Sequence, residues 1–169
     1  MKEIIKGVYR TGEVRNPSGT PLMIVHPWFR ERAFSQPFSL WAPNLREGKG
    51  DYKANLGSLL SSSKGKRSVI LLEQSSEVIS SSERIGKLFG EDDFYVVETM
   101  PFSDEPMADV EESYKFLSGF GSEVLLAGGY LRERESGKYD GCLGCFRNEL
   151  GRRGIQGSFV EGSCYTWPK

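Results

Sequence analysis

The chain has 169 residues, of which 38% are apolar and 27% are charged, a balance typical of a single folded domain. Its formal net charge is -1, from 22 basic and 23 acidic side chains, so we expect no general attraction to nucleic acid or to an anionic membrane surface. No apolar run approaches the roughly 20 residues that a membrane helix needs, and the first residues lack the apolar core of a signal peptide. Three cysteines are an odd number, which suits a reducing compartment better than a disulfide framework, so we expect a cytoplasmic protein.

The N-terminal part of the chain predicts a hairpin and then a buried strand. Residues 1–20 contain short β-prone pieces and a turn at Asn16–Gly19, which together favour a hairpin at the edge of a sheet. The apolar run Leu22–Val25 continues to His26 and is stopped by Pro27. A short, continuous and partly β-branched run of this kind indicates a strand that is buried on both faces.

Four further strands alternate with helices along the rest of the chain. The strands are predicted near residues 68–73, 94–98, 123–128 and 155–160. Periodic apolar residues predict four helices, beginning near Asp51, Val78, Pro106 and Cys142. Repeated βαβ units connect by right-handed crossovers, which place the strands in parallel. We therefore expect one domain over residues 1–169, an α/β protein of three layers (αβα) with a mostly parallel, doubly wound sheet of five or more strands.

Several chemically distinctive residues fall at the carboxyl ends of the predicted strands. His26, the only histidine, ends the first strand, and Glu98 ends the third. Cys142 and Cys145 open the helix after the fourth strand, and Cys164 lies just past the fifth. Ligands of open parallel sheets bind at this edge, where the order of the strands reverses. We therefore place the candidate site here.

A catalytic triad of Cys142, His26 and Glu98 is one interpretation of this set. The N-terminus of a helix favours a thiolate, which is the nucleophilic form of cysteine. His26 would then serve as its base, and Glu98 would orient the imidazole. The alternative is structural for each residue: a histidine that makes one hydrogen bond, a cysteine that packs as a small apolar side chain, and a solvated glutamate.

A family resemblance adds to this interpretation. The segment Val124–Gly129, the Cys142-Leu143 pair that opens a helix, and Gly154-Ile155 before the last strand resemble the isochorismatase-like cysteine hydrolases. Members of that family carry a strand that ends in glycine, a nucleophilic cysteine at the start of the next helix, and a glycine twelve residues later. The resemblance implies that Cys142 is the nucleophile of a hydrolase acting on a small amide or related compound, with no cofactor.

The sequence departs from the family pattern at three places. The family places an aspartate where this chain has His26, and a lysine where it has Glu98. A charged insertion at residues 131–141 also separates the glycines from the cysteine. Only Cys142 carries over from the family, so a non-catalytic member of the same fold, which binds a ligand or a partner, is the alternative.

The same cysteines allow a third interpretation. Cys142 and Cys145 form a CxxC motif, which suits thiol redox chemistry. Together with Cys164 and His26 they supply the donor set of a Cys₃His zinc site. We rank this zinc or redox site below the hydrolase and expect no metal.

A loop rich in aromatic residues, at positions 27–46, follows the first strand. A long loop in a small domain is typically a lid, a binding element or an interface. We expect it to cover a small-molecule site or to join subunits of a homo-oligomer; the alternative is packing against the domain's own core. The residues expected to bind the substrate are Trp28, Phe29, Phe38, Trp41 and Gly129.

Overall fold

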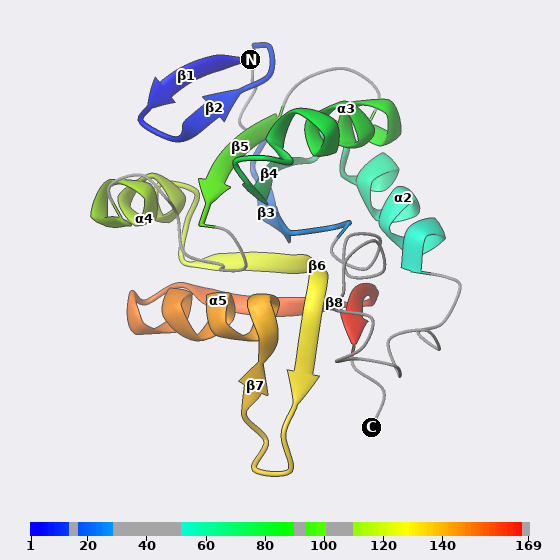
Figure 1. The fold of residues 1–169 in the computed structure, drawn as a ribbon, viewed down its shortest axis with the longest axis vertical. Coiled ribbons are helices and arrows are strands. Elements are labelled where there is room, and N and C mark those ends of the chain that lie inside the picture. The colour runs from blue at the N-terminus through cyan, green and yellow to red at the C-terminus, as the bar shows by residue number, and fades with distance from the viewer. Residues whose placement is uncertain (14–16, 29–51, 90–93, 101–109, 167–169) are drawn as a thin grey trace.

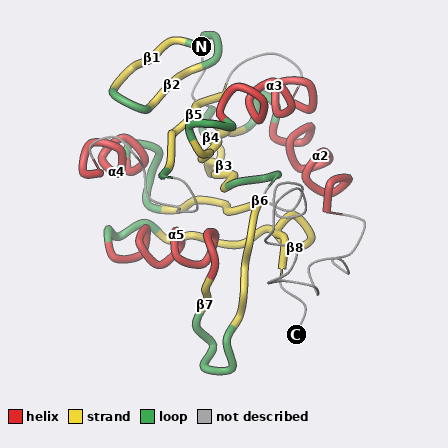
Figure 2. The backbone as a smooth tube through the Cα atoms, viewed as in Figure 1, coloured by secondary structure: helices red, strands yellow, loops and turns green. Residues whose placement is uncertain are grey.

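The computed structural model describes residues 1–13, 17–28, 52–89, 94–100 and 110–166 (Figure 1). The described residues form one eight-stranded sheet and four helices, which Figure 2 colours by type. The strands are β1 (Lys2–Ile5), β2 (Val8–Arg10), β3 (Gly19–Val25), β4 (Arg67–Gln74), β5 (Phe94–Thr99), β6 (Glu123–Glu133), β7 (Tyr139–Asp140) and β8 (Gln156–Thr166). The helices are α2 (Tyr52–Ser63), α3 (Val78–Phe89), α4 (Val110–Ser118) and α5 (Gly141–Arg152).

The protein is an α/β protein, as predicted, but its sheet is mixed. The strand order is β1-β2-β5-β4-β3-β6-β7, and β8 pairs with β6. Strands β3, β4, β5, β6 and β8 run parallel, whereas β1 with β2, β2 with β5 and β6 with β7 are antiparallel. The expectation of a mostly parallel sheet was therefore wrong.

The antiparallel pairings follow from short connections. Only Lys6 and Gly7 join β1 to β2, and Gly7 takes the left-handed φ of 74° that such a turn requires. Residues 134–138 likewise return the chain from β6 to β7, because connections this short cannot make a parallel crossover. The resulting β6–β7 hairpin extends at the bottom of Figure 1 and takes up most of the charged insertion at 131–141.

The parallel strands are buried on both faces, as their continuous apolar runs indicated. Leu22, Met23, Ile24 and Val25 are each 0% exposed. Leu22 and Ile24 belong to one apolar cluster, which includes residues of α2 and α3. Met23 and Val25 belong to a second cluster, with residues of α4 and α5. Side chains along a strand alternate between faces, so each face of the sheet has its own helix partners.

The helices bury one apolar stripe each. In α3, Val78, Ile85 and Phe89 are buried while Ile79 is 68% exposed, the spacing expected of a helix that covers a sheet. Helix α5 is capped by Asp140, whose side chain accepts a hydrogen bond from the backbone N–H of Gly141 at 2.8 Å. None of the helices described has the length and apolar character required to cross a membrane.

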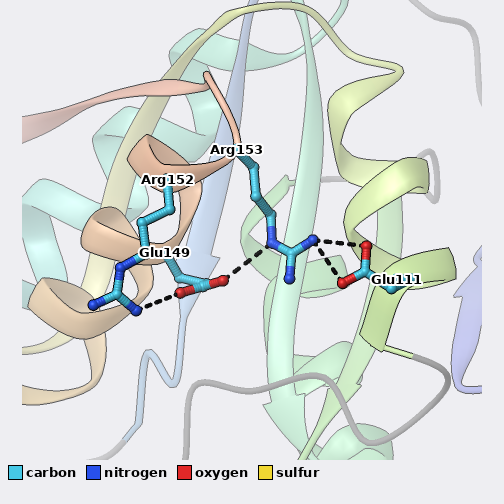
Figure 3. Close-up of polar contacts among 4 residues, drawn as sticks. All are labelled: Glu111, Glu149, Arg152 and Arg153. Carbon is cyan, nitrogen blue, oxygen red and sulfur yellow. Dashed lines mark hydrogen bonds and ion pairs between the residues drawn. The ribbon is translucent and has the colours of Figure 1, made fainter.

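An ion-pair network joins α5 to α4 (Figure 3). Nη1 of Arg153 donates to both carboxylate oxygens of Glu111 at 3.0 Å, and its Nε donates to Glu149 at 3.1 Å. Glu149 also accepts from Arg152 at 2.9 Å. The guanidinium of Arg153 lies 4.2 Å from the ring centroid of buried Tyr114, on α4. Arg153 therefore joins α5 to α4, whereas Arg152 pairs with Glu149 of its own helix.

Candidate functional site

The order of the parallel strands reverses between β3 and β6. From β3, the chain adds β4 and β5 on one side of the sheet and β6 and β8 on the other. Val25, the last residue of β3, pairs with Gly128 of β6. In open α/β sheets the carboxyl edge at such a reversal is where ligands bind. The candidate site is therefore the carboxyl edge of β3 and β6.

Two glycines allow β6 to approach β3 closely at this edge. Gly128 has a φ of 104°, and a Cβ added to it would lie 2.3 Å from the carbonyl oxygen of Val25. A Cβ on Gly129 would lie 2.5 Å from the carbonyl oxygen of His26. Any side chain at either position would push the strands apart. Gly129, which we expected to bind substrate, thus contacts the backbone of His26.

His26 takes a strained backbone conformation directly after β3. Its φ of 42° lies in the left-handed region, which is uncommon for residues other than glycine. Its side chain is 0% exposed, and its Nε2 lies 2.8 Å from Oγ1 of Thr99. The backbone N–H of His26 donates to the carbonyl of Leu72 at 2.9 Å. Strain of this kind persists where surrounding contacts fix the residue, and it is concentrated at functional sites.

Glu98, which was predicted to orient His26, contacts other residues instead. It precedes Thr99 on β5, so the two side chains point to opposite faces of the sheet. Burial, followed by the charge of Glu98, raises the pKa of Tyr9 on β2. Within the described residues, the hydrogen bonds of Glu98 go to Tyr9 and Gly7 rather than to His26. The partner found for the imidazole is Thr99, which sequence reasoning missed.

Cys142 lies in the first turn of α5 and is half-buried. The residue before it, Gly141, has a φ of 81°, and a Cβ there would lie 2.5 Å from the carbonyl oxygen of Tyr130. The start of α5 therefore packs directly on Tyr130, the residue that follows Gly129 in β6. Consecutive residues of β6 thus contact the segment that carries His26 and the segment that carries Cys142.

Two ionisable residues near Cys142, Tyr130 and Asp140, were not selected by sequence reasoning. Burial raises the pKa of Tyr130, the positive charge of Arg132 partly offsets this, and the negative charge of Asp140 adds to it, so the phenol stays protonated at neutral pH. The hydrogen bond from Arg134 lowers the pKa of Asp140, and the bond from the Gly141 N–H lowers it further. The sequence signal for Asp140 was its position as an N-cap before a helix.

The other two cysteines have separate environments. Cys145 is exposed, and its Sγ lies 3.9 Å from Oδ1 of Asp140. Cys164 lies within β8, not past the last strand as expected, because β8 continues beyond its apolar run to Thr166. Its thiol donates to the carbonyls of Leu126 and Val160, both at 3.4 Å. Burial raises the pKa of Cys164 to about 12, so this thiol is not a nucleophile near neutral pH.

The structure does not assemble the proposed zinc ligands. Within the described part of the chain, no three histidine, cysteine, aspartate or glutamate side chains gather as a metal-binding group. His26, Cys142, Cys145 and Cys164 all belong to that part. None of the three cysteines is in a disulfide, and on α5 Cys142 is half-buried while Cys145 is exposed.

Of the aromatic residues expected to bind substrate, only Trp28 is described. It is 6% exposed and packs in the cluster that includes α2 and α3. The guanidinium of Arg84 lies 3.7 Å from its ring centroid. Trp28 is thus part of the domain's own core, which is the alternative that the sequence left open. Phe29, Phe38 and Trp41, with nearly all of the loop 27–46, lie outside the described residues.

A buried glutamate lies near the end of β4, one residue after Leu72, whose carbonyl accepts from the backbone N–H of His26. Glu73 is 0% exposed, and it accepts hydrogen bonds from Ser81 Oγ at 2.8 Å and from the Gln74 N–H at 2.9 Å. Sequence reasoning missed Glu73 because it continues an apolar run.

No protein-family model and no curated protein matches this chain. The function therefore has to be inferred from the residues at the carboxyl edge of β3 and β6.

Proposed function

We propose that the protein is an isochorismatase-like cysteine hydrolase that acts on a small amide or related compound at the carboxyl edge of β3 and β6. The observation that carries the proposal is the pair of contacts along β6. Gly129 lies against His26 and Tyr130 lies against Gly141, the residue before Cys142. The backbone of His26 and the residue before Cys142 thus contact consecutive residues of one strand, and this supports placing the imidazole and the thiol in one site.

The proposed reaction uses the thiol of Cys142 and the imidazole of His26. The imidazole takes the thiol proton, and the thiolate attacks the carbonyl carbon of the amide. The C–N bond breaks as the imidazolium gives its proton to the leaving amine. Water, deprotonated by the same imidazole, then cleaves the thioester to a carboxylic acid and restores the thiol. The overall reaction is the hydrolysis of an amide to an acid and an amine.

Two further residues support this chemistry. Thr99 positions the ring of His26 through the bond of 2.8 Å, the role that the sequence gave to Glu98. Tyr130 packs against Gly141, the residue before Cys142, and its phenol is protonated at neutral pH, which supports a role as hydrogen-bond donor to the oxygen of the tetrahedral intermediate. The proposal also takes the fold as a doubly wound, three-layer sheet. The two separate apolar clusters, each with its own pair of helices, support that arrangement.

Thiol labelling tests the proposal without knowledge of the substrate. Iodoacetamide at pH 7 should modify Cys142 faster than Cys145, although Cys145 is the more exposed thiol. A Cys145→Ser variant should keep the fast phase, and Cys142→Ser should lose it. His26→Ala should slow the labelling of Cys142, and its circular dichroism spectrum serves as the control for folding. Faster labelling of Cys145, or a Cys142 rate indifferent to His26, contradicts the proposal.

The second candidate function is non-catalytic binding of a ligand at the same edge. The complete burial of His26 and its bond to Thr99 favour it, because such a histidine also serves a purely structural role. Amides that raise the melting temperature equally in wild type and Cys142→Ser, with no product by mass spectrometry, would support this function.

Assembly into a homo-oligomer through residues 27–46 stays a prediction, and light scattering of the purified chain tests it.

A further inference from the structure

A basic hollow lies between α5 and the β6–β7 hairpin, and it shares no lining residue with the candidate site. Its volume is about 420 Å³. Its lining contains three cationic side chains and no carboxylate, in a chain whose net charge is -1. The lining residues are Gly137, Lys138, Tyr139, Arg147, Asn148 and Arg152.

Arg147, one of the residues that line this hollow, is held in place by three contacts. Its Nε donates to the carbonyl of Gly157 at 3.0 Å. Its guanidinium carbon lies 5.1 Å from the ring centroid of Tyr139 and 5.4 Å from that of Phe159. These contacts fix the plane of the guanidinium while its terminal N–H groups remain for another acceptor. A positioned, planar donor set of this kind matches the oxygens of a phosphate or a carboxylate.

Arg147 and Arg152, the two arginines of the hollow, differ in whether a carboxylate pairs with them. Arg152 pairs with Glu149, which offsets its charge within the hollow. Within the described residues Arg147 makes no ion pair, and the other cation of the hollow, Lys138, is exposed. Arg147 and Lys138 therefore give the hollow an excess of positive charge, which attracts an anion.

A second hollow of about 360 Å³ adjoins the first across Arg147 and Asn148. Apart from Arg147 its lining is uncharged: Asn148, Gly151, Gly154, Ile155, Gln156 and Gly157. The two volumes lie within the range of sites for small molecules, about 300–1,000 Å³. One hollow thus suits an anionic group and its neighbour suits an uncharged body.

We propose that these two hollows bind a small phosphate monoester. Its phosphate lies on Arg147 and Lys138, and its uncharged body lies in the hollow lined by the three glycines. This site is independent of Cys142 and of the proposed hydrolase.

Calorimetric titration with three probes tests whether one hollow binds the phosphate and the other binds the uncharged body of the ligand. Ribose 5-phosphate should bind more tightly than inorganic phosphate, and ribose alone should give no heat of binding. Arg147→Gln should weaken the binding of ribose 5-phosphate by about tenfold or more, since a charged hydrogen-bond donor is lost. Arg147→Lys should lose less affinity, because lysine keeps the charge but lacks the planar set of donors. Arg10→Gln, an arginine that lines neither hollow, is the control and should bind as wild type does.

A glycine substitution separates binding from stability. A Cβ on Gly151 would have nothing within 4 Å, and Gly151 lines the uncharged hollow, so we expect a larger side chain there to narrow the hollow at little cost in stability. Gly151→Leu should weaken the binding of ribose 5-phosphate by about tenfold, and it should leave the affinity for inorganic phosphate unchanged. The proposal is overturned if ribose 5-phosphate does not bind, or if Arg147→Gln or Gly151→Leu binds it as tightly as wild type.

Discussion

The imidazole Nε2 of His26 lies 2.8 Å from Oγ1 of Thr99, although the two residues are 73 positions apart in the chain. They follow β3 and end β5, two strands separated in the sheet by β4. The imidazole therefore reaches across the end of β4. Both residues are 0% exposed, so water does not replace the bond if it is lost.

Thr99→Val should destabilise the protein by about 1–3 kcal/mol, the cost of a buried polar group that loses its hydrogen bond. Valine keeps the shape of threonine and removes only the hydroxyl. Urea unfolding followed by circular dichroism measures the change, and Thr99→Ser should recover most of it. A valine variant as stable as wild type would mean that the bond to Thr99 does not hold His26.

Gly128→Ala should be among the most damaging single substitutions at the candidate site. The new Cβ would lie 2.3 Å from the carbonyl oxygen of Val25, and the φ of 104° is unfavourable for alanine. We expect a loss of about 3 kcal/mol or more from the strain and the displaced strand. Gly137→Ala is the matched control, because its φ is 72° and nothing lies within 4 Å of the new Cβ. It should lose only about 1–2 kcal/mol, and equal losses would contradict the close approach of β6 to β3.

The buried strands and the helix faces could be predicted from the sequence because each leaves a local pattern. The apolar run Leu22–Val25 and the spacing of Val78, Ile85 and Phe89 both reflect burial directly. The edge formed by β6 and β7 leaves no such pattern. Strand β6 continues past its apolar run into charged residues, and β7 is only Tyr139–Asp140, so the hairpin there depends on pairing that composition does not encode.

The edge of the sheet at which His26 and Cys142 lie could be predicted, but the residues that contact them could not. Parallel strands end at one edge, so His26 and Cys142 could be assigned there from strand ends alone. Glu98 and Thr99 are neighbours on β5, and a shift of one residue exchanges the two faces of a strand. Which of them meets His26 depends on register and strand order. The contact between Tyr130 and Gly141 likewise depends on how α5 packs against β6.

Glu149→Gln should destabilise the protein more than Glu111→Gln. Glu149 joins Arg152 to Arg153 and has a side chain that is 18% exposed, whereas Glu111 is 78% exposed and contacts only Arg153 within this network. Loss of Glu149 also leaves two adjacent arginines with less compensating charge. Urea unfolding at low and at high salt measures both variants, and salt should reduce the difference between them because it screens the exposed charges. The reverse order would contradict the network.

Cys164 should make the protein less stable as the pH rises above 9. Burial raises the pKa of this thiol from 9.0 to about 12, so the unfolded chain releases the proton at a lower pH than the folded chain. Between these values the folded state holds more protons, and the free energy of unfolding falls with increasing pH. The contribution of this thiol is fully present below pH 9 and is lost on approach to pH 12, at about 1.4 kcal/mol per pH unit.

Comparison of wild type with Cys164→Ala isolates this effect from the tyrosines and lysines that titrate in the same range. At pH 7 the variant should be the less stable protein, because alanine leaves a space where the thiol packed between β6 and β8. The stability difference should then shrink between pH 9 and pH 10.5, since only wild type loses the contribution of the thiol. Cys145→Ala, at an exposed thiol, serves as the control. A difference between wild type and Cys164→Ala that stays constant up to pH 10.5 would mean that Cys164 ionises as readily in the folded protein as in the unfolded chain.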